Sequence, residues 1–195
     1  MFSFWNLLFL TSGLLPGPAA KPPQTAPTAP GKPPVAAPIP WSAARRLVIA
    51  DFQGRPNQLY PQPALTASDI KAGAACRDFV FTSTVQATFD PNNSWFRQPL
   101  KVSAALLQHE QTHFDLTEVY ARLLRQKLVV FQAKVDCNKL QPGFNNLTKT
   151  VYAAWAKEQN RYDAETAHGL NAARQAFWEK EVQVRLTQLD AFAAH

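Results

Sequence analysis

The sequence contains only two cysteines and four histidines, and it has no run of Lys or Arg longer than two. Each of these scarcities argues against a class of protein or of metal site. The formal net charge is +6, from 20 Lys and Arg against 14 Asp and Glu. Scattered basic residues without a patch argue against a nucleic-acid-binding protein. Neither Cys76 nor Cys137 has a second Cys or a His two to four residues away, which argues against a cysteine-type zinc site.

The N-terminal apolar stretch, residues 2–15, is typical of a secretory signal peptide. It is shorter than the roughly 20 residues that a membrane-spanning helix needs. Small residues follow at Gly17, Ala19 and Ala20, so we expect a signal peptide over residues 1–20 with cleavage after Ala19 or Ala20. No Lys or Arg precedes the apolar core, and an uncleaved anchor or a buried helix is the alternative. No Cys lies near the cleavage point, which argues against a bacterial lipoprotein.

A segment rich in Pro and Ala separates this stretch from the rest of the chain. Residues 16–40 hold ten of the sixteen prolines, which remove backbone donors and leave little apolar area to bury. We therefore expect a linker over residues 21–40 and one folded domain over residues 41–195. Because the domain follows an export signal, we expect a secreted or periplasmic protein with Cys76 bridged to Cys137, two unpaired thiols being the alternative.

Hydrophobic periodicity predicts an α+β domain. Apolar and polar residues alternate over residues 79–89, which is the strongest strand prediction, and residues 90–93 form a turn. Residues 46–52 are a weaker strand candidate, and the polar, proline-containing segments 57–75 and 136–146 are predicted loops.

Three helices are predicted after these strands. The first is capped by Ser103 and runs to about Phe131, with apolar residues at spacings of three and four. The others cover about residues 147–159 and 171–192. The expected fold is a small, mostly antiparallel sheet packed against one long metal-bearing helix, with two further helices after it, as in zincins.

The chemistry is concentrated in the first of these helices, which contains His-Glu-x-x-His. The spacing of four places His109 and His113 on one face, where both imidazoles can bind the same Zn²⁺ ion, and Glu110 can reach a water on that metal. Zinc lowers the pKa of a bound water to about 7, and a neighbouring carboxylate can take its proton. The alternative is a pair of core histidines held by ordinary hydrogen bonds.

A catalytic zinc site needs a third protein ligand. His168 is the other internal histidine, and it lies near the carboxylates Asp163 and Glu165. His168 is the first candidate, Glu165 the second and Asp163 the third, and the unused groups would orient the ligands. Asp115 and Glu118 are further candidates for that orienting role. Tyr162 is either an oxyanion donor or a packing residue.

The motifs together resemble a known family, the bacterial domain-of-unknown-function family 922, whose secreted members are labelled as zinc-dependent proteases. The resemblance covers most of the chain after the linker. It is carried by four segments and five further residues. The segments are Asp51-Phe52-Gln53-Gly54-Arg55-Pro56, Ser94-Trp95, Leu107-Gln108-His109-Glu110-Gln111-Thr112-His113-Phe114-Asp115 and Tyr162-Asp163-Ala164-Glu165-Thr166-Ala167-His168-Gly169, and the further residues are Glu118, Ala121, Arg122, Gln175 and Trp178. It implies a metallopeptidase-like domain of the bacterial envelope or outside the cell, and it names no substrate.

These observations predict a monomeric zinc metallopeptidase. One Zn²⁺ ion is held by His109, His113 and His168, and Glu110 is the general base. We expect a peptide or protein as the substrate and no binding of nucleic acid. We also expect no membrane span in the mature protein. The strand over residues 79–89 can offer an edge to an extended peptide. The alternatives are a non-catalytic envelope protein with a structural zinc, which binds a partner or the cell wall, and a zinc amidase acting on cell-wall amides.

Overall fold

The computed structural model describes residues 35–194, so the predicted signal peptide and most of the predicted linker lie outside the described residues. Five strands come first, namely β1 (Ile39–Pro40), β2 (Ala64–Leu65), β3 (Ser68–Arg77), β4 (Val80–Phe89) and β5 (Trp95–Phe96). Three helices follow, namely α1 (Ala104–Gln132), α2 (Leu140–Thr166) and α3 (Ala172–Gln188). The α+β class, the small antiparallel sheet and the long helix with two further helices are confirmed.

The strands form two small antiparallel sheets. β3 and β4 make a ten-residue hairpin, paired from Ser68 opposite Phe89 to Arg77 opposite Val80, and β1 pairs with the other edge of β4. The last two residues of the predicted linker thus pair with the fold. β2 and β5 form the second sheet. Because β4 lies between β1 and β3, the strand predicted to accept a peptide is an interior strand where β1 covers it.

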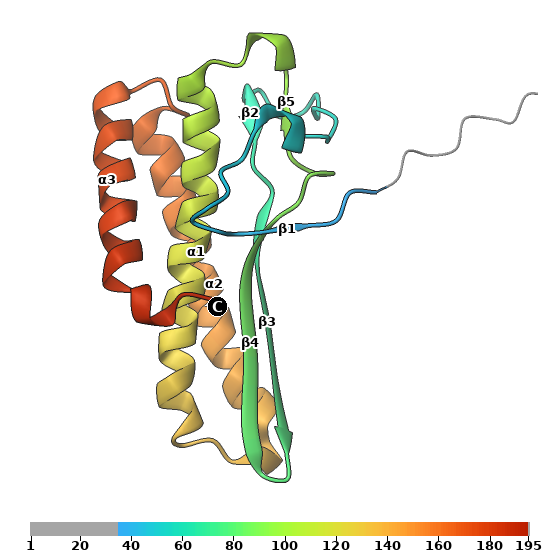
Figure 1. The fold of residues 1–195 in the computed structure, drawn as a ribbon, viewed down its shortest axis with the longest axis vertical. Coiled ribbons are helices and arrows are strands. Elements are labelled where there is room, and N and C mark those ends of the chain that lie inside the picture. The colour runs from blue at the N-terminus through green and yellow to red at the C-terminus, as the bar shows by residue number, and fades with distance from the viewer. Residues whose placement is uncertain (1–34, 195) are drawn as a thin grey trace, which may run out of the picture. The chain divides into compact units, whose positions relative to one another are not determined.

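Helix α1 lies between the hairpin and α3, with α2 beside it (Figure 1). The Ser103 side chain accepts a hydrogen bond from the backbone N–H of Leu106, which satisfies one of the four free donors at the helix start. The helix buries most of its middle, including polar residues, because it contacts β4, α2 and α3 on different faces. Its second and third turns carry the His-Glu-x-x-His motif to the interior.

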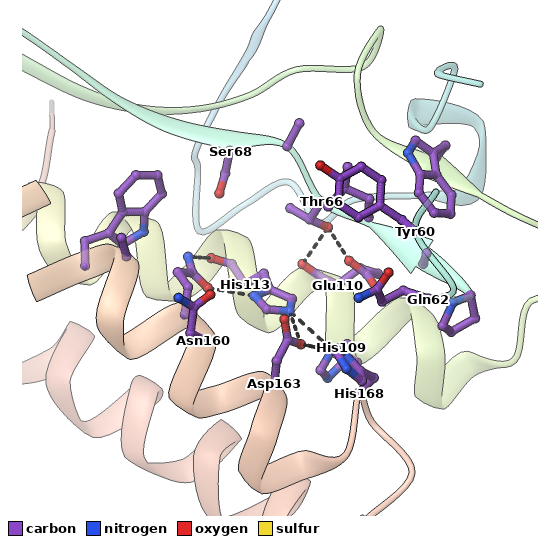
Figure 2. Close-up of a pocket in the computed structure, with 18 residues that line it drawn as sticks. Tyr60, Gln62, Thr66, Ser68, His109, Glu110, His113, Asn160, Asp163 and His168 are labelled. Atoms are coloured by element: carbon purple, nitrogen blue, oxygen red, sulfur yellow. Dashed lines mark hydrogen bonds and ion pairs between the residues drawn. The ribbon is translucent and has the colours of Figure 1, made fainter. Parts of the chain in front are cut away.

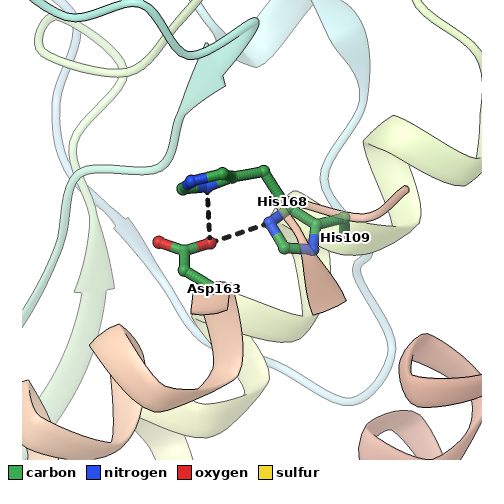
Figure 3. Close-up of side chains that lie close together, drawn as sticks. All are labelled: His109, Asp163 and His168. Carbon is green, nitrogen blue, oxygen red and sulfur yellow. Dashed lines mark hydrogen bonds and ion pairs between the residues drawn. The ribbon is translucent and has the colours of Figure 1, made fainter. Parts of the chain in front are cut away.

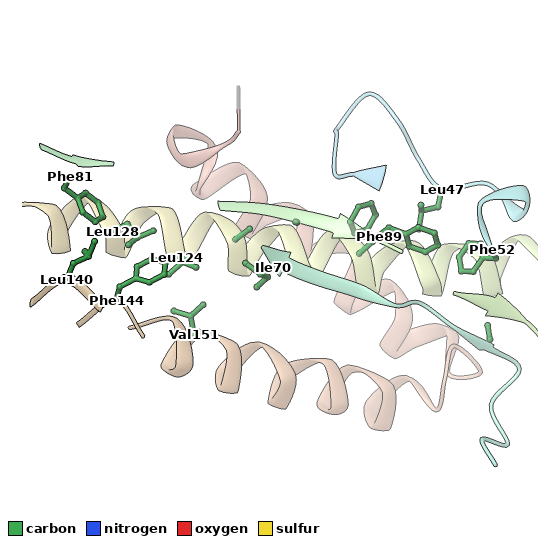
Figure 4. Packing of buried hydrophobic residues seen from close by; sticks show 14 of the residues in the cluster. Leu47, Phe52, Ile70, Phe81, Phe89, Leu124, Leu128, Leu140, Phe144 and Val151 are labelled. Atoms are coloured by element: carbon green, nitrogen blue, oxygen red, sulfur yellow. The ribbon is translucent and has the colours of Figure 1, made fainter. Parts of the chain in front are cut away.

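One hydrophobic cluster fills the space between the hairpin, α1 and α2 (Figure 4). Phe89 and Phe114 meet there from β4 and α1, with ring centroids 5.8 Å apart. A second cluster lies between α1 and α3 around Trp178. The predicted disulfide is present, since Cys76 at the end of β3 is bonded to Cys137 after α1. Among the described residues, no helix has the length and hydropathy of a membrane span.

Three sequence predictions of local structure are wrong. Residues 46–52 form no strand, because the Asp51 carboxylate accepts the Val48 N–H and closes a short 3-10 turn at Ile49–Asp51. The predicted loop 57–75 contains β2 and most of β3, which are held by pairing to β5 and β4. The predicted loop 136–146 contains the start of α2, because Pro142 lies in the first helical turn, where its missing N–H costs nothing.

Candidate metal centre

The two motif histidines lie side by side on α1, and their rings are held between that helix and α2 (Figure 2). Their Nε2 atoms are 3.2 Å apart. His109 is 1 % exposed, and the His113 side chain is 12 % exposed. Two imidazole nitrogens at this separation in an interior position need a proton or a cation between them, because two lone pairs repel.

Each ring is oriented by a glutamine. His113 Nδ1 is 2.6 Å from Gln159 Oε1, and His109 Nδ1 is 3.1 Å from Gln175 Oε1. The Gln159 amide nitrogen donates to the carbonyl oxygen of His113, which can only accept, so the amide oxygen faces the ring. Both Nδ1 atoms are therefore donors, so a neutral ring has its lone pair on Nε2 and a protonated ring donates from Nε2 as well.

Asp163, near the end of α2, completes this arrangement. Its Oδ1 lies 2.9 Å from His113 Nε2 and 3.1 Å from His109 Nε2. Burial alone would raise the pKa of Asp163, but hydrogen bonds and charge from the two histidines outweigh it and hold that pKa well below its usual range. For His113, burial would lower the pKa, yet the Asp163 hydrogen bond and the Glu110 and Asp163 charges raise it. The surroundings of His113 thus favour the positively charged form of its ring.

His168 reaches the same carboxylate from a tight turn after α2 (Figure 3). Its Nδ1 lies 3.3 Å from Asp163 Oδ1, and the ligand atoms of His109, Asp163 and His168 all lie within 4.8 Å of one another. Ala167, His168 and Gly169 all have positive φ. A Cβ at Gly169 would lie 3.1 Å from the His109 ring carbon Cγ, so this turn also packs against the first histidine.

The other predicted carboxylates lie elsewhere. Glu165 Oε2 accepts from the Trp178 indole and pairs with Arg174, and its Oε1 is 3.3 Å from Arg161. Asp115 accepts hydrogen bonds from Trp41 and Gln111, and Glu118 pairs with Arg122 and Arg125. The orienting role that the sequence suggested for Asp115 and Glu118 therefore belongs to the two glutamines.

Glu110 lies beside the cluster at the floor of a pocket of about 370 Å³, which His109, His113, Asp163 and His168 also line. The Thr66 hydroxyl donates to Glu110 Oε2 at 2.7 Å (Figure 2). The contact fixes one carboxylate oxygen and ties the residue that follows β2 to the motif.

Tyr162 is a packing and positioning residue. It is fully buried, its ring stacks on His109 at 4.7 Å, and its hydroxyl donates to Gln175 Oε1 at 2.8 Å. Burial raises the pKa of Tyr162 far above its usual value, so the phenol keeps its proton. Sequence reasoning missed the roles of Gln159 and Thr66, since neither carries a motif signal.

The donor atoms of His109, His113 and Asp163 have separations close to those of tetrahedral zinc ligands. Ligands about 2.0–2.1 Å from zinc are about 3.3 Å from one another in a tetrahedron. The His109, His113 and Asp163 atoms are separated by 3.2, 3.1 and 2.9 Å, and His168 lies 3.3 Å from Asp163. A His-Asp-His group, formed by His109, Asp163 and His168, could therefore bind a metal ion.

One of three comparisons with known proteins found a match. The family model for bacterial proteins of unknown function, DUF922, matches residues 66–169, just over half of the chain. The matched range runs from just before β3 to the turn after α2 and includes every residue of the His-Asp cluster. No curated protein and no solved structure matches the chain.

Proposed function

This chain belongs to DUF922, a bacterial family of unknown function, and from its site we propose that it is an exported zinc-dependent metallopeptidase. The observation that carries the proposal is that three imidazoles converge on the Asp163 carboxylate. The glutamine contacts at Nδ1 of His109 and His113 leave the Nε2 atoms of both rings facing that carboxylate. A zinc ion there supplies a Lewis acid that lowers the pKa of water and polarises an amide carbonyl.

Four groups are available to hold the ion. His109 and His113 come from α1, and Asp163 and His168 come from the end of α2 and the following turn. We propose the imidazoles of His109, His113 and His168 as ligands and add Asp163, because its Oδ1 lies within 3.3 Å of a nitrogen of each ring. His168 has a side chain that is 44 % exposed, so we expect it to be the weakest of the four ligands.

Glu110 is proposed as the general base. Its carboxylate faces the pocket beside the histidines, and Thr66 leaves its Oε1 free to accept a proton from water. The same group can then give the proton to the leaving amine. The Cys76–Cys137 bond and the bacterial family are compatible with a secreted or periplasmic location.

The test combines metal analysis with proteolysis. We expect the purified chain to hold one zinc ion by elemental mass spectrometry and to cleave members of a peptide library. Glu110→Gln keeps the metal and loses hydrolysis by at least about 100-fold, the contribution of a general base. Glu181→Gln, which changes a carboxylate on α3 far along the chain from the motif, leaves both unchanged. Full activity of the Glu110 variant would exclude the mechanism.

A non-catalytic metal site is the second candidate, and the presence of four ligands favours it. Four protein ligands close a tetrahedral zinc, as in structural sites, whereas a catalytic zinc keeps one position open. If chelation by EDTA unfolds the protein while neither peptides nor cell-wall fragments are cleaved, the structural role is correct. Cleavage of cell-wall amides alone would make the chain an amidase. Absence of zinc and an EDTA-insensitive Tm would refute both metal proposals.

A further inference from the structure

The second sheet has one edge whose backbone groups are unused. Arg97 N–H donates to the carbonyl of Pro63 at 2.8 Å, and Leu65 lies opposite Trp95 in β5. In an antiparallel pair the hydrogen-bonded residues alternate, so Pro63 and Leu65 face β5, whereas Ala64 and Thr66 direct their N–H and C=O groups away from it. Within residues 35–194 these groups of Ala64 and Thr66 make no backbone hydrogen bond.

This free edge borders the pocket of the metal centre. Residues 64–68 line it together with Trp155, Ala156 and Asn160 of α2. Figure 2 shows Thr66 and Ser68 across from Asn160. The Thr66 side chain holds Glu110 from the same strand segment, so a chain lying along the edge passes next to the base. The pocket therefore joins unpaired backbone groups to the proposed catalytic residues.

Two further observations indicate what the pocket accepts. Gln62 lines it, and Gln62 Oε1 is buried without a hydrogen-bond partner among the described residues, which marks an unsatisfied acceptor at the pocket wall. Tyr60 and Leu65 line the same pocket and are 53 % and 42 % exposed. A ligand that supplies backbone donors and an apolar side chain matches these groups.

We propose that residues 64–66 bind an extended peptide by β-strand addition, with an apolar side chain of the peptide against Tyr60 and Leu65. The proposal rests on the proposed peptidase function and specifies how its substrate binds. Main-chain hydrogen bonds to Ala64 and Thr66 position the peptide, while pockets for alternate side chains select it. Selection by sequence is therefore confined to alternate residues of the substrate.

The first experiment titrates chelating probes into the zinc-loaded protein by calorimetry. Acetohydroxamate reports the metal alone, and a hydroxamate extended by Ala-Leu-Ala adds the peptide. We expect the extended probe to bind at least tenfold more tightly. Methylation of a single amide nitrogen weakens binding about 3- to 10-fold at alternate positions and has little effect between them, because each hydrogen bond contributes modestly. Equal affinity of the two probes, or losses without alternation, overturns the proposal.

A matched pair of variants tests the location. Ala156→Phe fills the pocket from α2, and Ala154→Phe adds the same ring about 200° around that helix, where the residue is also exposed. Ala156→Phe should abolish the higher affinity of the extended probe relative to acetohydroxamate, and it should leave zinc content and acetohydroxamate binding unchanged. Ala154→Phe should change none of them. If Ala156→Phe leaves the higher affinity intact, the peptide binds elsewhere.

A metal-independent measurement separates the two proposals. The Ala-Leu-Ala peptide without the hydroxamate is titrated into zinc-free protein and followed by amide NMR shifts. Shifts confined to residues 62–68 and α2 support the edge even if zinc never binds, in which case only the metallopeptidase proposal fails. Zinc uptake together with no peptide binding in any titration overturns the edge proposal alone.

Discussion

Two glutamine side chains decide the chemistry open to the histidines of the site. Gln159 and Gln175 accept from the Nδ1 atoms of His113 and His109, which leaves each Nε2 as the nitrogen available to the proposed metal. The Gln175 amide nitrogen donates to Glu179, so the Gln175 amide oxygen is the atom that faces His109. Such neighbours of metal ligands set tautomer and ring angle, and their loss typically costs about 10- to 100-fold in metal affinity.

Gln159→Met should therefore lower zinc affinity about tenfold or more, because it removes the acceptor for His113 Nδ1 and leaves the ring free to change tautomer. Competition with a fluorescent zinc chelator measures the effect. Gln141→Met, an exposed position in the first turn of the same helix, is the control and should leave affinity unchanged. Equal affinities in both variants would mean that Gln159 does not orient His113.

Gly169 positions His109 from the other side. Its φ of +83° and the 3.1 Å separation between an added Cβ and the His109 ring both disfavour any side chain. Gly169→Ala should lower zinc affinity at least about tenfold and destabilise the fold by about 1 kcal/mol. Gly73→Ala, in β3 and without positive φ, should keep zinc affinity. Chelator competition and urea unfolding measure the two effects, and unchanged affinity in Gly169→Ala would contradict the positioning role.

At the scale of elements, pairing matters more than intrinsic preference. β3 contains Gly73 and several alanines, which are weak strand formers, and yet it pairs with β4 over ten residues. The alternation in β4 supplies buried Phe81, Ala87 and Phe89, whose packing holds the register. The turn between the strands is the one strained point of this hairpin, since Asp78 and Phe79 both have positive φ.

Phe79→Gly should stabilise the protein by about 1 kcal/mol, measured as the free energy of unfolding in urea. Asp-Gly suits a two-residue hairpin turn with two positive φ angles, whereas Phe is strained there. The Phe79 side chain is 81 % exposed, so its loss removes little packing. Phe79→Ala, which keeps the strain and loses the ring, should change stability little. A similar gain in both variants would attribute the effect to the ring.

At the scale of the whole molecule, the disulfide and the His-Asp cluster hold opposite ends of the helix pair. Cys76–Cys137 ties the hairpin to the connection between α1 and α2, and the His-Asp cluster ties the start of α1 to the end of α2. The bond closes a loop with a sequence separation of 61 residues. A loop of that length restricts the unfolded chain by about 4 kcal/mol in the chain-entropy model.

Replacing both cysteines with serine should therefore lower the free energy of unfolding by about 2–5 kcal/mol. Zinc affinity should persist at low temperature, where the variant stays folded, because the cysteines lie at the opposite end of α1 from His109 and His113. Thermal unfolding and chelator competition test the two parts. Loss of zinc affinity in the folded variant would show that the two ends are coupled.

The sequence by itself determined the elements whose signals are local and periodic. The 3.6-residue pattern after Ser103 identified α1 and placed both histidines on its inner face, and alternation identified β4. The even cysteine count predicted the disulfide. Each of these depends on spacing along one segment, which side-chain geometry converts directly into a face of a helix or strand.

Only the tertiary structure decided which distant groups meet. It placed Asp163 between the histidines, sent Glu165 to Arg174 and Trp178, and replaced the expected Asp115 and Glu118 with two glutamines. It also made a strand of residues 68–77 and left the edge of β2 open beside Glu110. These outcomes depend on contacts between residues far apart in the chain, whose free energy of burial and pairing outweighs local preference.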